Sequence, residues 1–591
     1  MFGPFQGPVD KLEPLPLEEG PDKTTSLPQA VRKFVKPGML VHLSTTHNRP
    51  GAAIMELVRE FRGKDPRLTL SCVGFVSNGV LPVHTGIAKK LISTFTGDSY
   101  PTPGPNPVIT RAWASGELEI ENWSILSFTQ RLMAGAMGFP WMPTNSISGS
   151  SMAEDNEGLY REEVLEDGNR TGMVAALRPD VAFIHAPCAD RAGNVILTPP
   201  FGEDCYGAYA AKDGVIVSVD KIVSTEFVRR NSHLAKIPGY MVLAVCPVPL
   251  GAHPGGVSSQ GLPDFESYAD DYEFMLDIRD ASKSRETMDE WIKHWMDDAP
   301  DWESYLAKLG KDRIWTLKGK ARPDSWKTEL LEMADKIPDG PEYTPIEMMV
   351  VGAGRKLADR MRTKGWKTIL AGVGTSNLAA WLAYYSLLED GTECDLMAEI
   401  GFYGYAPRPA DPFIFNYRNM PAAKMLTGIP NIMGVFMGGS ANCSIGAIGA
   451  GQIDSKANIN TTMIPGVAWL TGSGGGNDIA SSACEVLVTA FSGRKRFVKE
   501  LPYVTSPGRA VRTVVSESGV FEKERGESEL VLTEYFPVEG QGEDETVQGI
   551  RENCGWDLKV SSSIRVAEPP ALSELRMVRI LDPKRQFLGK R

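Results

Sequence analysis

The sequence predicts an α/β protein built from two tandem, similar open α/β domains with largely parallel sheets. Three observations predict this class. Short apolar segments alternate with polar turns and helical patterns through the first half of the chain. The same alternation restarts near Ile346. Short motifs also recur in the same order in both halves, which is typical of a duplicated fold.

The first half shows the clearest alternation of strands, turns and helices. Its expected elements are a helix over 27–35, a strand over 38–43, a helix over 50–61 and a strand over 68–75. Later apolar runs have the length of buried parallel strands, at 180–185, 215–219 and 241–245. A helical, acidic region with three tryptophans follows over 264–309. The second half is expected to open with a helix over 346–363, a strand over 368–371 and a helix over 377–388.

Two local echoes support the duplication. The stretches 190–195 and 454–459 share the pattern Asp-x-x-small-Asn-β-branched, and each follows an apolar strand. A Pro-Gly pair, Pro254-Gly255 in one half and Pro507-Gly508 in the other, closes each sheet region. With the shared opening order, these echoes predict two similar domains that face each other with a site between them.

The chain is therefore expected to have four parts. Residues 1–25 are Pro-rich and acidic and are interpreted as an extended N-terminal arm. Residues 26–320 form the first domain and residues 346–591 the second. The stretch 321–345 is charged and contains prolines, which is typical of a linker.

Composition limits the classes of partner and cofactor. The 62 basic and 74 acidic residues give a net charge of −12, which argues against nucleic acid as a partner. No apolar run is long enough to span a membrane. The eight cysteines include no Cys-x-x-Cys pair, which indicates free thiols and a cytoplasmic protein. The seven histidines form no ligand-like cluster, so we expect no metal.

Glu399 is the strongest candidate for a catalytic group. It ends the short apolar segment that begins near Cys394, and Gly401 and Gly404 follow it closely. A carboxylate at the end of a rigid strand is well placed to act as a nucleophile. The plainer interpretation is an exposed glutamate before a turn.

Three glycine-rich elements of the second half bear on Glu399, at 372–374, 446–452 and 472–478. Glycine loops let backbone N–H groups approach an anion or a developing oxyanion, although glycines also simply make turns. The first element lacks the third glycine of a dinucleotide fingerprint, and Asn377 stands there instead. No Gly-Lys-Ser/Thr follows the last element, so it is not a P-loop.

Several longer stretches carry a family resemblance. In the second half they are Ala398-Glu399-Ile400-Gly401, Gly449-Ala450-Gly451-Gln452-Ile453-Asp454, Thr471-Gly472-Ser473-Gly474-Gly475, Arg494-Lys495-Arg496-Phe497, Tyr503-Val504-Thr505-Ser506-Pro507-Gly508 and Glu552-Asn553-Cys554-Gly555-Trp556-Asp557-Leu558. This ordered set resembles the β subunit of glutaconate CoA-transferase and, more distantly, other family I CoA-transferases. Stretches 249–254 and 305–310 of the first half resemble the α subunit. The resemblance therefore implies a fusion of α and β subunits with the family I CoA-transferase fold.

The resemblance also implies a mechanism. Glu399 occupies the position of the family's catalytic glutamate, which attacks an acyl-CoA thioester and then carries CoA as a glutamyl thioester before transfer to a second carboxylic acid. CoA thioester is thus a substrate, and no permanently bound cofactor is expected. The residues expected to bind CoA or the oxyanion are Gly372, Gly374, Gly449, Gly451, Gln452, Gly472, Gly474 and Gly475.

The family's α subunits carry Gly-Gly-Phe after the first strand, whereas this chain has Leu43-Ser44-Thr45-Thr46-His47. Hydroxyl groups of Ser44, Thr45 or Thr46 are the possible replacement donors. Arg494, Lys495 and Arg496 are the candidate ligands for the CoA phosphates, although such a run is commonly a solvated surface.

Two alternative functions stay open at this point. The same fold can serve an acyl-CoA hydrolase that opens a thioester or a ring, and related α/β folds serve as non-catalytic ligand sensors. The family and the tryptophan-rich region also predict a homodimer or a higher homo-oligomer.

Overall fold

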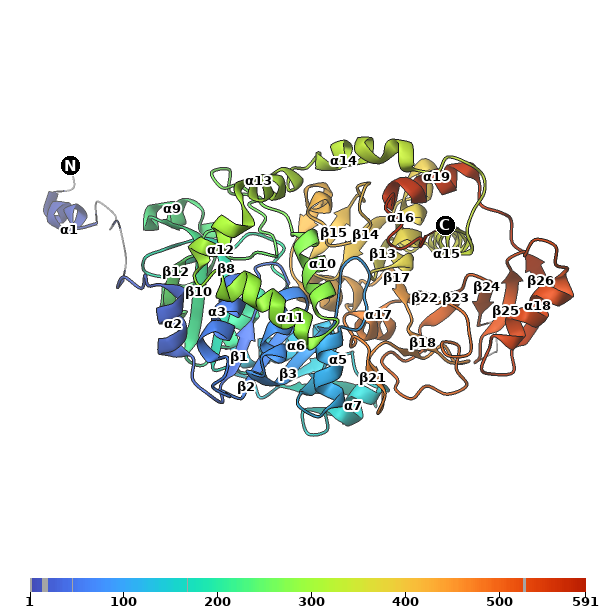
Figure 1. Cartoon of the computed structure of the whole chain (residues 1–591), viewed down its shortest axis with the longest axis horizontal. Helices are drawn as coiled ribbons and strands as arrows, with labels where there is room; N and C mark the ends of the chain where they lie inside the picture. The colour runs from blue at the N-terminus through green and yellow to red at the C-terminus, as the bar shows by residue number, and fades with distance from the viewer. Residues whose placement is uncertain are drawn as a thin grey trace.

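Figure 1 shows a computed structural model of the chain, which describes residues 3–12, 17, 20–44, 46–166, 168, 170–523 and 528–590. Two large sheets, of nine and ten strands, belong to the first and second halves of the chain. The first half occupies the left of Figure 1 and the second half the right. The predicted class of tandem α/β domains with largely parallel sheets is confirmed.

The first sheet has a parallel core of seven strands in the order β12-β10-β8-β1-β2-β3-β4. The strands are β1 (Leu40–Leu43), β2 (Leu68–Phe75), β3 (Ala88–Thr96), β4 (Glu119–Asn122), β8 (Val181–Asp190), β10 (Gly214–Val223) and β12 (Val242–Pro247). Two short antiparallel strands, β9 (Val195–Ile196) and β11 (Ala235–Ile237), continue from the far end of β8. Every residue of β8 is buried, as expected for a central parallel strand.

The second sheet runs in the order β16-β15-β14-β13-β17-β22-β23-β24-β25-β26. Its strands are β13 (Thr368–Ala371), β14 (Asp395–Ala398), β15 (Phe402–Tyr405), β16 (Met425–Leu426), β17 (Ser444–Gly449), β22 (Glu485–Thr489), β23 (Val511–Val515), β24 (Gly519–Glu522), β25 (Val531–Tyr535) and β26 (Lys559–Val566). The five strands from β14 to β23 are parallel. Their carboxyl ends therefore lie along one edge of the sheet.

The first helices of each half lie close to the ranges that the sequence predicts. The observed helices are α2 (Leu27–Phe34), α3 (Gly51–Phe61), α15 (Pro345–Lys364) and α16 (Thr375–Glu389), each within a few residues of its expected range. Local capping explains the boundaries of α2 and α15. Ser26 accepts from the N–H of Gln29 at the start of α2, and Thr344 and Glu347 form a reciprocal capping box at the start of α15.

Strand order and hydrogen bonding are shared by the two halves. Outward from β1 or β13, each sheet has the next strands in sequence on one side and later strands on the other. The Asp-Asn echo is also the same local structure. Asn194 N–H donates to Asp190 Oδ1 at 2.8 Å, and Asn458 N–H donates to Asp454 Oδ1 at 2.9 Å. In both halves the asparagine Nδ2 then donates to the other oxygen of the same aspartate.

The Pro-Gly echo was paired wrongly in the first half. Asn458 Oδ1 accepts from the N–H of Gly508 at 2.8 Å, whereas Asn194 Oδ1 accepts from the N–H of Gly239 at 3.0 Å. The counterpart of Pro507-Gly508 is therefore Pro238-Gly239, which precedes β12 as Pro507-Gly508 precedes β23. The stretch at Pro254-Gly255 comes after the last strand of the first sheet and belongs to a different turn.

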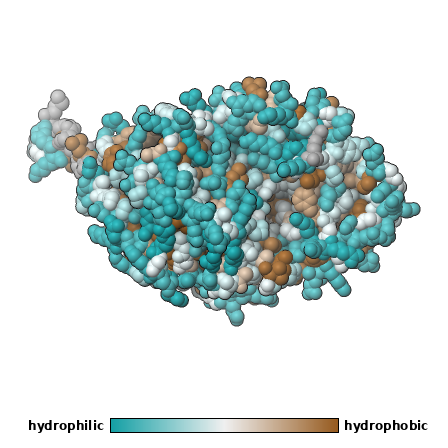
Figure 2. Space-filling model, in the orientation of Figure 1, coloured by the Kyte–Doolittle hydropathy of each residue, from teal (hydrophilic) through white to brown (hydrophobic). Residues whose placement is uncertain are grey.

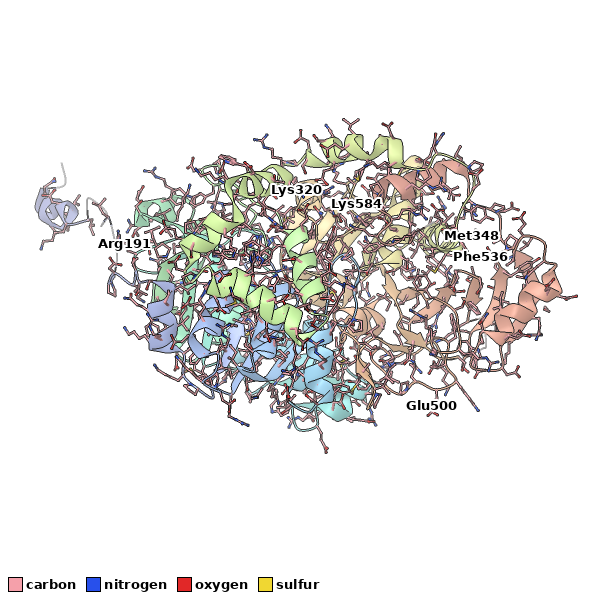
Figure 3. All side chains as sticks on the ribbon, in the orientation of Figure 1. Arg191, Lys320, Met348, Glu500, Phe536 and Lys584 are labelled. Carbon is pink, nitrogen blue, oxygen red and sulfur yellow. The ribbon has the colours of Figure 1, made fainter. Side chains whose placement is uncertain are left out.

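Helices connect the two halves along the top of Figure 1. The acidic region divides into α10 (Tyr272–Ala281), α11 (Arg285–Ile292) and α12 (Trp302–Leu309), followed by α13 (Lys311–Lys320). The expected linker itself contains the helix α14 (Ser325–Met333). Lys320, at the end of α13, is labelled near the top of Figure 3, ahead of this connection.

The N-terminal arm also differs from an extended segment, because residues Gln6–Asp10 form the short helix α1 at the far left of Figure 1. Figure 2 shows a largely hydrophilic face with scattered hydrophobic patches. In the described part of the chain, no helix is both long and apolar enough to cross a membrane.

Candidate active site

Glu399 lies directly after β14, in the tight turn that leads into the antiparallel strand β15. Gly401 makes this turn possible because its φ is +131° and a side chain there would overlap the carbonyl oxygen of Thr427. The turn leaves Glu399 partly buried at the carboxyl edge of the parallel strands. The strand-end placement expected from the sequence is therefore observed.

Gly475 forms the surface against which the Glu399 carboxylate rests. A methyl group on Gly475 would overlap Glu399 Oε2 and would lie 3.1 Å from Met433 Cε. The backbone N–H of Gly475 lies close enough to the carboxylate to favour its ionised form. Of the three glycine-rich elements, the one at 472–478 thus contacts Glu399 directly.

The electrostatics of Glu399 are unusual for a glutamate. Burial, with a smaller contribution from the nearby charge of Asp478, raises its pKa to about 7, against the opposing hydrogen bond from Gly475. Burial likewise raises the pKa of Asp478 to about 6. A carboxylate with weak solvation and a neighbour of the same charge is a stronger nucleophile than one in water.

The first half holds the Gly475 loop from one side. The N–H of Thr96 donates to Thr471 O, and the N–H of Gly474 donates to Thr94 O at 2.9 Å. Ile125 N–H donates to Gly474 O at 3.0 Å. Ile125 begins α6 (Ile125–Met137), which Ser124 caps by accepting from the N–H of Ser127. Glu399 therefore lies at the seam between the two halves.

A second segment of the first half lies on the other side of Gly401. Pro200 Cβ would lie 3.0 Å from a β-carbon on Gly401, and Gly202 forms an isolated β-bridge with Gly428. Phe201 N–H donates to Thr427 O at 2.7 Å. Residues 200–202 thus form a wall beside the Glu399 turn.

The turn that replaces the family's Gly-Gly-Phe lies behind this wall. Thr46 packs against Gly202 and donates its hydroxyl hydrogen to the carboxylate of Glu203, which is fully buried. Ser44 Oγ is buried and has no hydrogen-bond partner among the described residues. Thr45 lies outside the described residues. His47 Nδ1 lies 3.3 Å from Tyr417 Oη, a contact between the halves.

The remaining glycine elements lie further along the same sheet edge. Gly372 follows β13, and Gly374, with φ +124°, is the N-cap of α16. Gly449 ends β17, two strands from β14. A β-carbon on Gly374 or Gly449 would meet no atom within 4 Å, so the space above both is open. Gly472 instead packs against Thr94 and Asn122 of the first half.

Two further predicted binding residues are engaged with other parts of the second half. A β-carbon on Gly451 would lie 2.8 Å from Asn460 O. Gln452 accepts from Asn460 Nδ2 at 2.9 Å and donates to Lys495 O at 3.0 Å. Gln452 therefore links the basic run at 494–496 to the segment that contains Asn460.

The basic run Arg494, Lys495 and Arg496 is exposed and follows β22. Because β22 is three strands from β14 and neighbouring strands are about 4.8 Å apart, it lies roughly 14 Å along the edge from Glu399. Arg494 Nε donates to Glu552 O at 2.7 Å, and the Arg496 guanidinium lies 5.5 Å from the Phe491 ring centre. The run therefore follows a strand that ends on the same sheet edge as β14, and no phosphate site is shown there.

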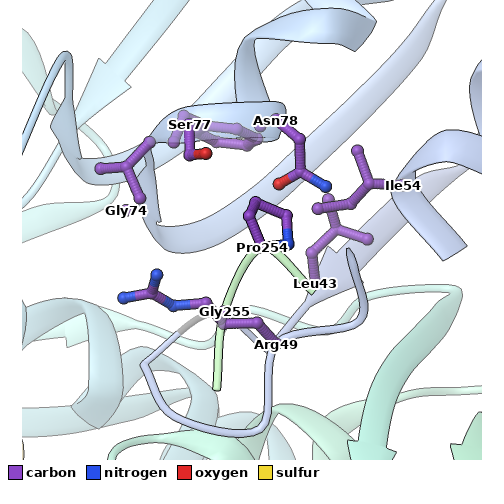
Figure 4. A pocket seen from close by; sticks show the side chains of 11 residues that line it. Leu43, Arg49, Ile54, Gly74, Ser77, Asn78, Pro254 and Gly255 are labelled. Atoms are coloured by element: carbon purple, nitrogen blue, oxygen red, sulfur yellow. The ribbon is translucent and has the colours of Figure 1, made fainter. Parts of the chain in front are cut away.

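Figure 4 shows a small cavity in the first half, between the ends of β1 and β2. Its volume is about 10 Å³, and its lining includes Arg49, Ser77, Asn78 and Pro254. That space holds about one water molecule, so the cavity is too small for an acyl group. Within the described ranges, no cluster of three or more His, Cys, Asp or Glu side chains is arranged to bind a metal ion.

Comparisons with known proteins show the family of the chain. A family model described as Coenzyme A transferase matches residues 24–246. The first of the two subunits of 3-oxoadipate CoA-transferase from Pseudomonas knackmussii is 30% identical over 293 residues, which cover 98% of that subunit and 49% of this chain. The chain belongs to the coenzyme A transferase family.

A second relative and a solved structure extend this result. The other subunit of the same Pseudomonas enzyme is 28% identical over 262 residues, which cover 94% of that subunit and 41% of this chain. The chain therefore resembles a fusion of the two subunits. The acyl-CoA transferase YdiF from Escherichia coli O157:H7 covers 98% of this chain with a TM-score of 0.64 and 15% identity, a likeness of fold.

Sequence reasoning missed several residues that surround Glu399. Asp478 ends the glycine-rich element at 472–478, and an acid in the first turn of a helix is a recognisable signal. The wall at 200–202 carries no local signal, because only the association of the two halves brings it to Glu399. Met433 carries none either, because it reaches the site only through the folding of the second half.

Proposed function

We propose that the chain transfers coenzyme A between an acyl-CoA and a carboxylic acid by a ping-pong mechanism, with Glu399 as the covalent nucleophile. The observation that carries the proposal is the Glu399 carboxylate resting on the N–H of Gly475 at the seam between the halves. Family membership supports the substrate class.

In the first step, a Glu399 oxygen attacks the thioester carbonyl carbon, and the carbonyl electron pair moves to oxygen. Collapse of this oxyanion expels the CoA thiolate and leaves an acyl-glutamyl anhydride. The thiolate then attacks the glutamyl carbonyl, releasing the acyl group as a carboxylate and leaving a glutamyl-CoA thioester. An acceptor carboxylate repeats these steps in reverse, so no net proton or electron is consumed.

The chain's own groups suit these steps. The N–H of Gly475 is a fixed donor beside the carboxylate, and such donors stabilise charge that develops on oxygen. The open space above Gly374 and Gly449 lies along the same edge, toward the basic run at 494–496, and is the proposed path of the CoA arm. Arg494, Lys495 and Arg496 are the proposed phosphate ligands at its end.

The test uses succinyl-CoA and a set of acceptor acids, with mass spectrometry of the protein after exposure to succinyl-CoA alone. We expect a CoA adduct on the peptide containing Glu399, which borohydride removes by reduction. Glu399→Gln keeps the shape but lacks the attacking anion, so transfer should fall by more than the roughly 10²–10⁴-fold of a lost general base. Glu399→Asp retracts the anion by one methylene and should also lose most of its activity. A CoA adduct on another residue would overturn the assignment.

A hydrolase is the second candidate, favoured by one observation. Glu203 is a buried carboxylate directly after the wall at 200–202, and a carboxylate close to a thioester can direct water to it. Incubation with acyl-CoA but no acceptor acid separates the two functions. A hydrolase releases CoA over many turnovers, and Glu203→Gln abolishes the release. A transferase stops after one equivalent bound to the protein.

A further inference from the structure

Asp478 is a buried carboxylate that connects the two halves beside Glu399. It lies in the first turn of α17 (Gly476–Ser482), and its side chain is fully buried. Its Oδ2 accepts from the N–H of Leu126 at 3.1 Å, and its Oδ1 accepts from the hydroxyl of Ser146. Both donors belong to the first half of the chain. Asn477, its neighbour, accepts from the N–H of Ile147 at 2.8 Å.

One helical turn joins Asp478 to the donor that contacts Glu399. The N–H of Ile479 donates to Gly475 O at 3.0 Å, which closes the first turn of α17 over residues 475–479. Gly475 therefore cannot move relative to Asp478 without breaking the start of the helix. The position of the Gly475 N–H is set by α6 of the first half, acting through Asp478.

The start of α6 gives Asp478 more donors than the Leu126 N–H. The Ser124 hydroxyl and the N–H of Ile125 also favour its ionised form, as does Ser146. These donors support a negative charge on the helical turn that carries Gly475. A charge buried near Glu399 disfavours a second charge there, so it opposes ionisation of the Glu399 carboxyl.

We propose that Asp478 is a positioning residue for Glu399: anchored by α6 and Ser146, it fixes the Gly475 N–H and supplies the negative charge that keeps the Glu399 anion weakly stabilised and reactive. This inference rests on the proposed nucleophilic role of Glu399. In this proposal, the first half of the chain anchors the charged group that keeps the nucleophile of the second half reactive.

The other charged groups on the packed elements have partners of their own. Arg131 of α6 pairs with Glu121 of β4 at 2.6 Å, away from the N-terminus of the helix. Glu203, which follows the wall at 200–202, accepts from Thr46. The helical segment Pro430–Met437 that carries Met433 contains no charged residue. Burial and Asp478 raise the pKa of Glu399, as described above, which agrees with this arrangement.

The experiment measures the protonation of Glu399 without turnover. A water-soluble carbodiimide with an amine labels protonated carboxyl groups, and mass spectrometry follows the peptide that contains Glu399 from pH 4 to pH 9. Labelling of the native protein should fall with a midpoint near the pKa of about 7. Asp478→Asn removes the like charge, so the midpoint should move down by about one pH unit or more.

Ser146→Ala is the second variant, because it removes a hydrogen bond without touching the carboxylate. The Ser146 hydroxyl favours the ionised form of Asp478. Its loss lets Asp478 hold its proton at higher pH, so the Glu399 midpoint should move down as well, by less than in Asp478→Asn. If Asp478→Asn does not fold, Ser146→Ala decides the question.

Asp155→Asn is the matched control. Asp155 also accepts a hydrogen bond across the halves, from Tyr503 Oη at 2.7 Å, but it is exposed. The control should leave the Glu399 midpoint unchanged. Folded Asp478→Asn and Ser146→Ala proteins with the native midpoint would overturn the inference. Failure of the proposed function looks different, because no CoA adduct would form on Glu399 while the midpoint still shifted.

Discussion

At the residue scale, the raised pKa of Glu399 predicts the pH dependence of transfer. The attacking species is the ionised carboxylate, so the reaction needs Glu399 without its proton. With a pKa of about 7, kcat/KM of the first half-reaction should fall about tenfold per pH unit below pH 7 and level off above it. Quenched-flow measurement of the carboxylate released from the acyl-CoA, between pH 5 and pH 9, measures this. A flat profile down to pH 5 would mean that Glu399 titrates as an ordinary glutamate.

Gly475 gives a second prediction at this scale. In Gly475→Ala the new methyl group occupies the space of the Glu399 carboxylate, so the carboxylate must turn away from its donor. We expect transfer to fall by about 10²–10³-fold, the loss typical of a misplaced donor to an oxyanion. Gly476→Ala is the control, because its methyl group would lie 3.7 Å from Ser506 Oγ in ordinary contact. Equal activity in both variants would show that Gly475 does not support Glu399.

At the element scale, the paired Asp-Asn turns should contribute equally to the local stability of their two halves. Asn194→Ala leaves the N–H of Gly239 without its acceptor, and Asn458→Ala does the same to Gly508. A lost acceptor costs about 1–3 kcal/mol, so hydrogen exchange near Gly239 or Gly508 should speed up roughly tenfold or more. Asn553→Ala removes an exposed bond to Gly549 O and should change neither. Faster hydrogen exchange in only one of the two variants would contradict this prediction. The two turns would then share their backbone geometry but not their contribution to stability.

Elements were predictable where the signal is local. The strands at 68–75 and 368–371 depend on neighbouring residues, so their sequence patterns located them. The pairing of Pro507-Gly508 was not predictable, because Asn458 selects its partner through a contact 50 residues away. The surroundings of Glu399 were not predictable for the same reason, since Pro200 comes from the other half.

At the scale of the whole molecule, the two halves share one hydrophobic core. Phe128 and Ile147 of the first half belong to the same buried cluster as Met397, Met433 and Ile479 of the second. We therefore expect the halves to associate without the peptide link. A chain divided in the exposed turn at 322–324 should yield two fragments that elute together in size-exclusion chromatography.

The division point leaves α14 attached to the second half, where Glu329 pairs with Arg418 at 2.9 Å. The two fragments, 1–322 and 323–591, are co-expressed for this test. Mass spectrometry of the eluted complex then gives the ratio of one fragment to the other. Fragments that elute separately would show that the link, rather than the shared core, holds the halves together.

The helical connection through α13 and α14 has a consequence for stoichiometry. Two separate subunits find each other at a rate set by their concentrations, and their synthesis must be matched. In a single chain, each half experiences the other at an effective concentration of the order of millimolar. Dilution to nanomolar protein therefore leaves the two halves of each chain in contact. Each chain that is translated also brings one Glu399 together with one complete set of the residues that surround it.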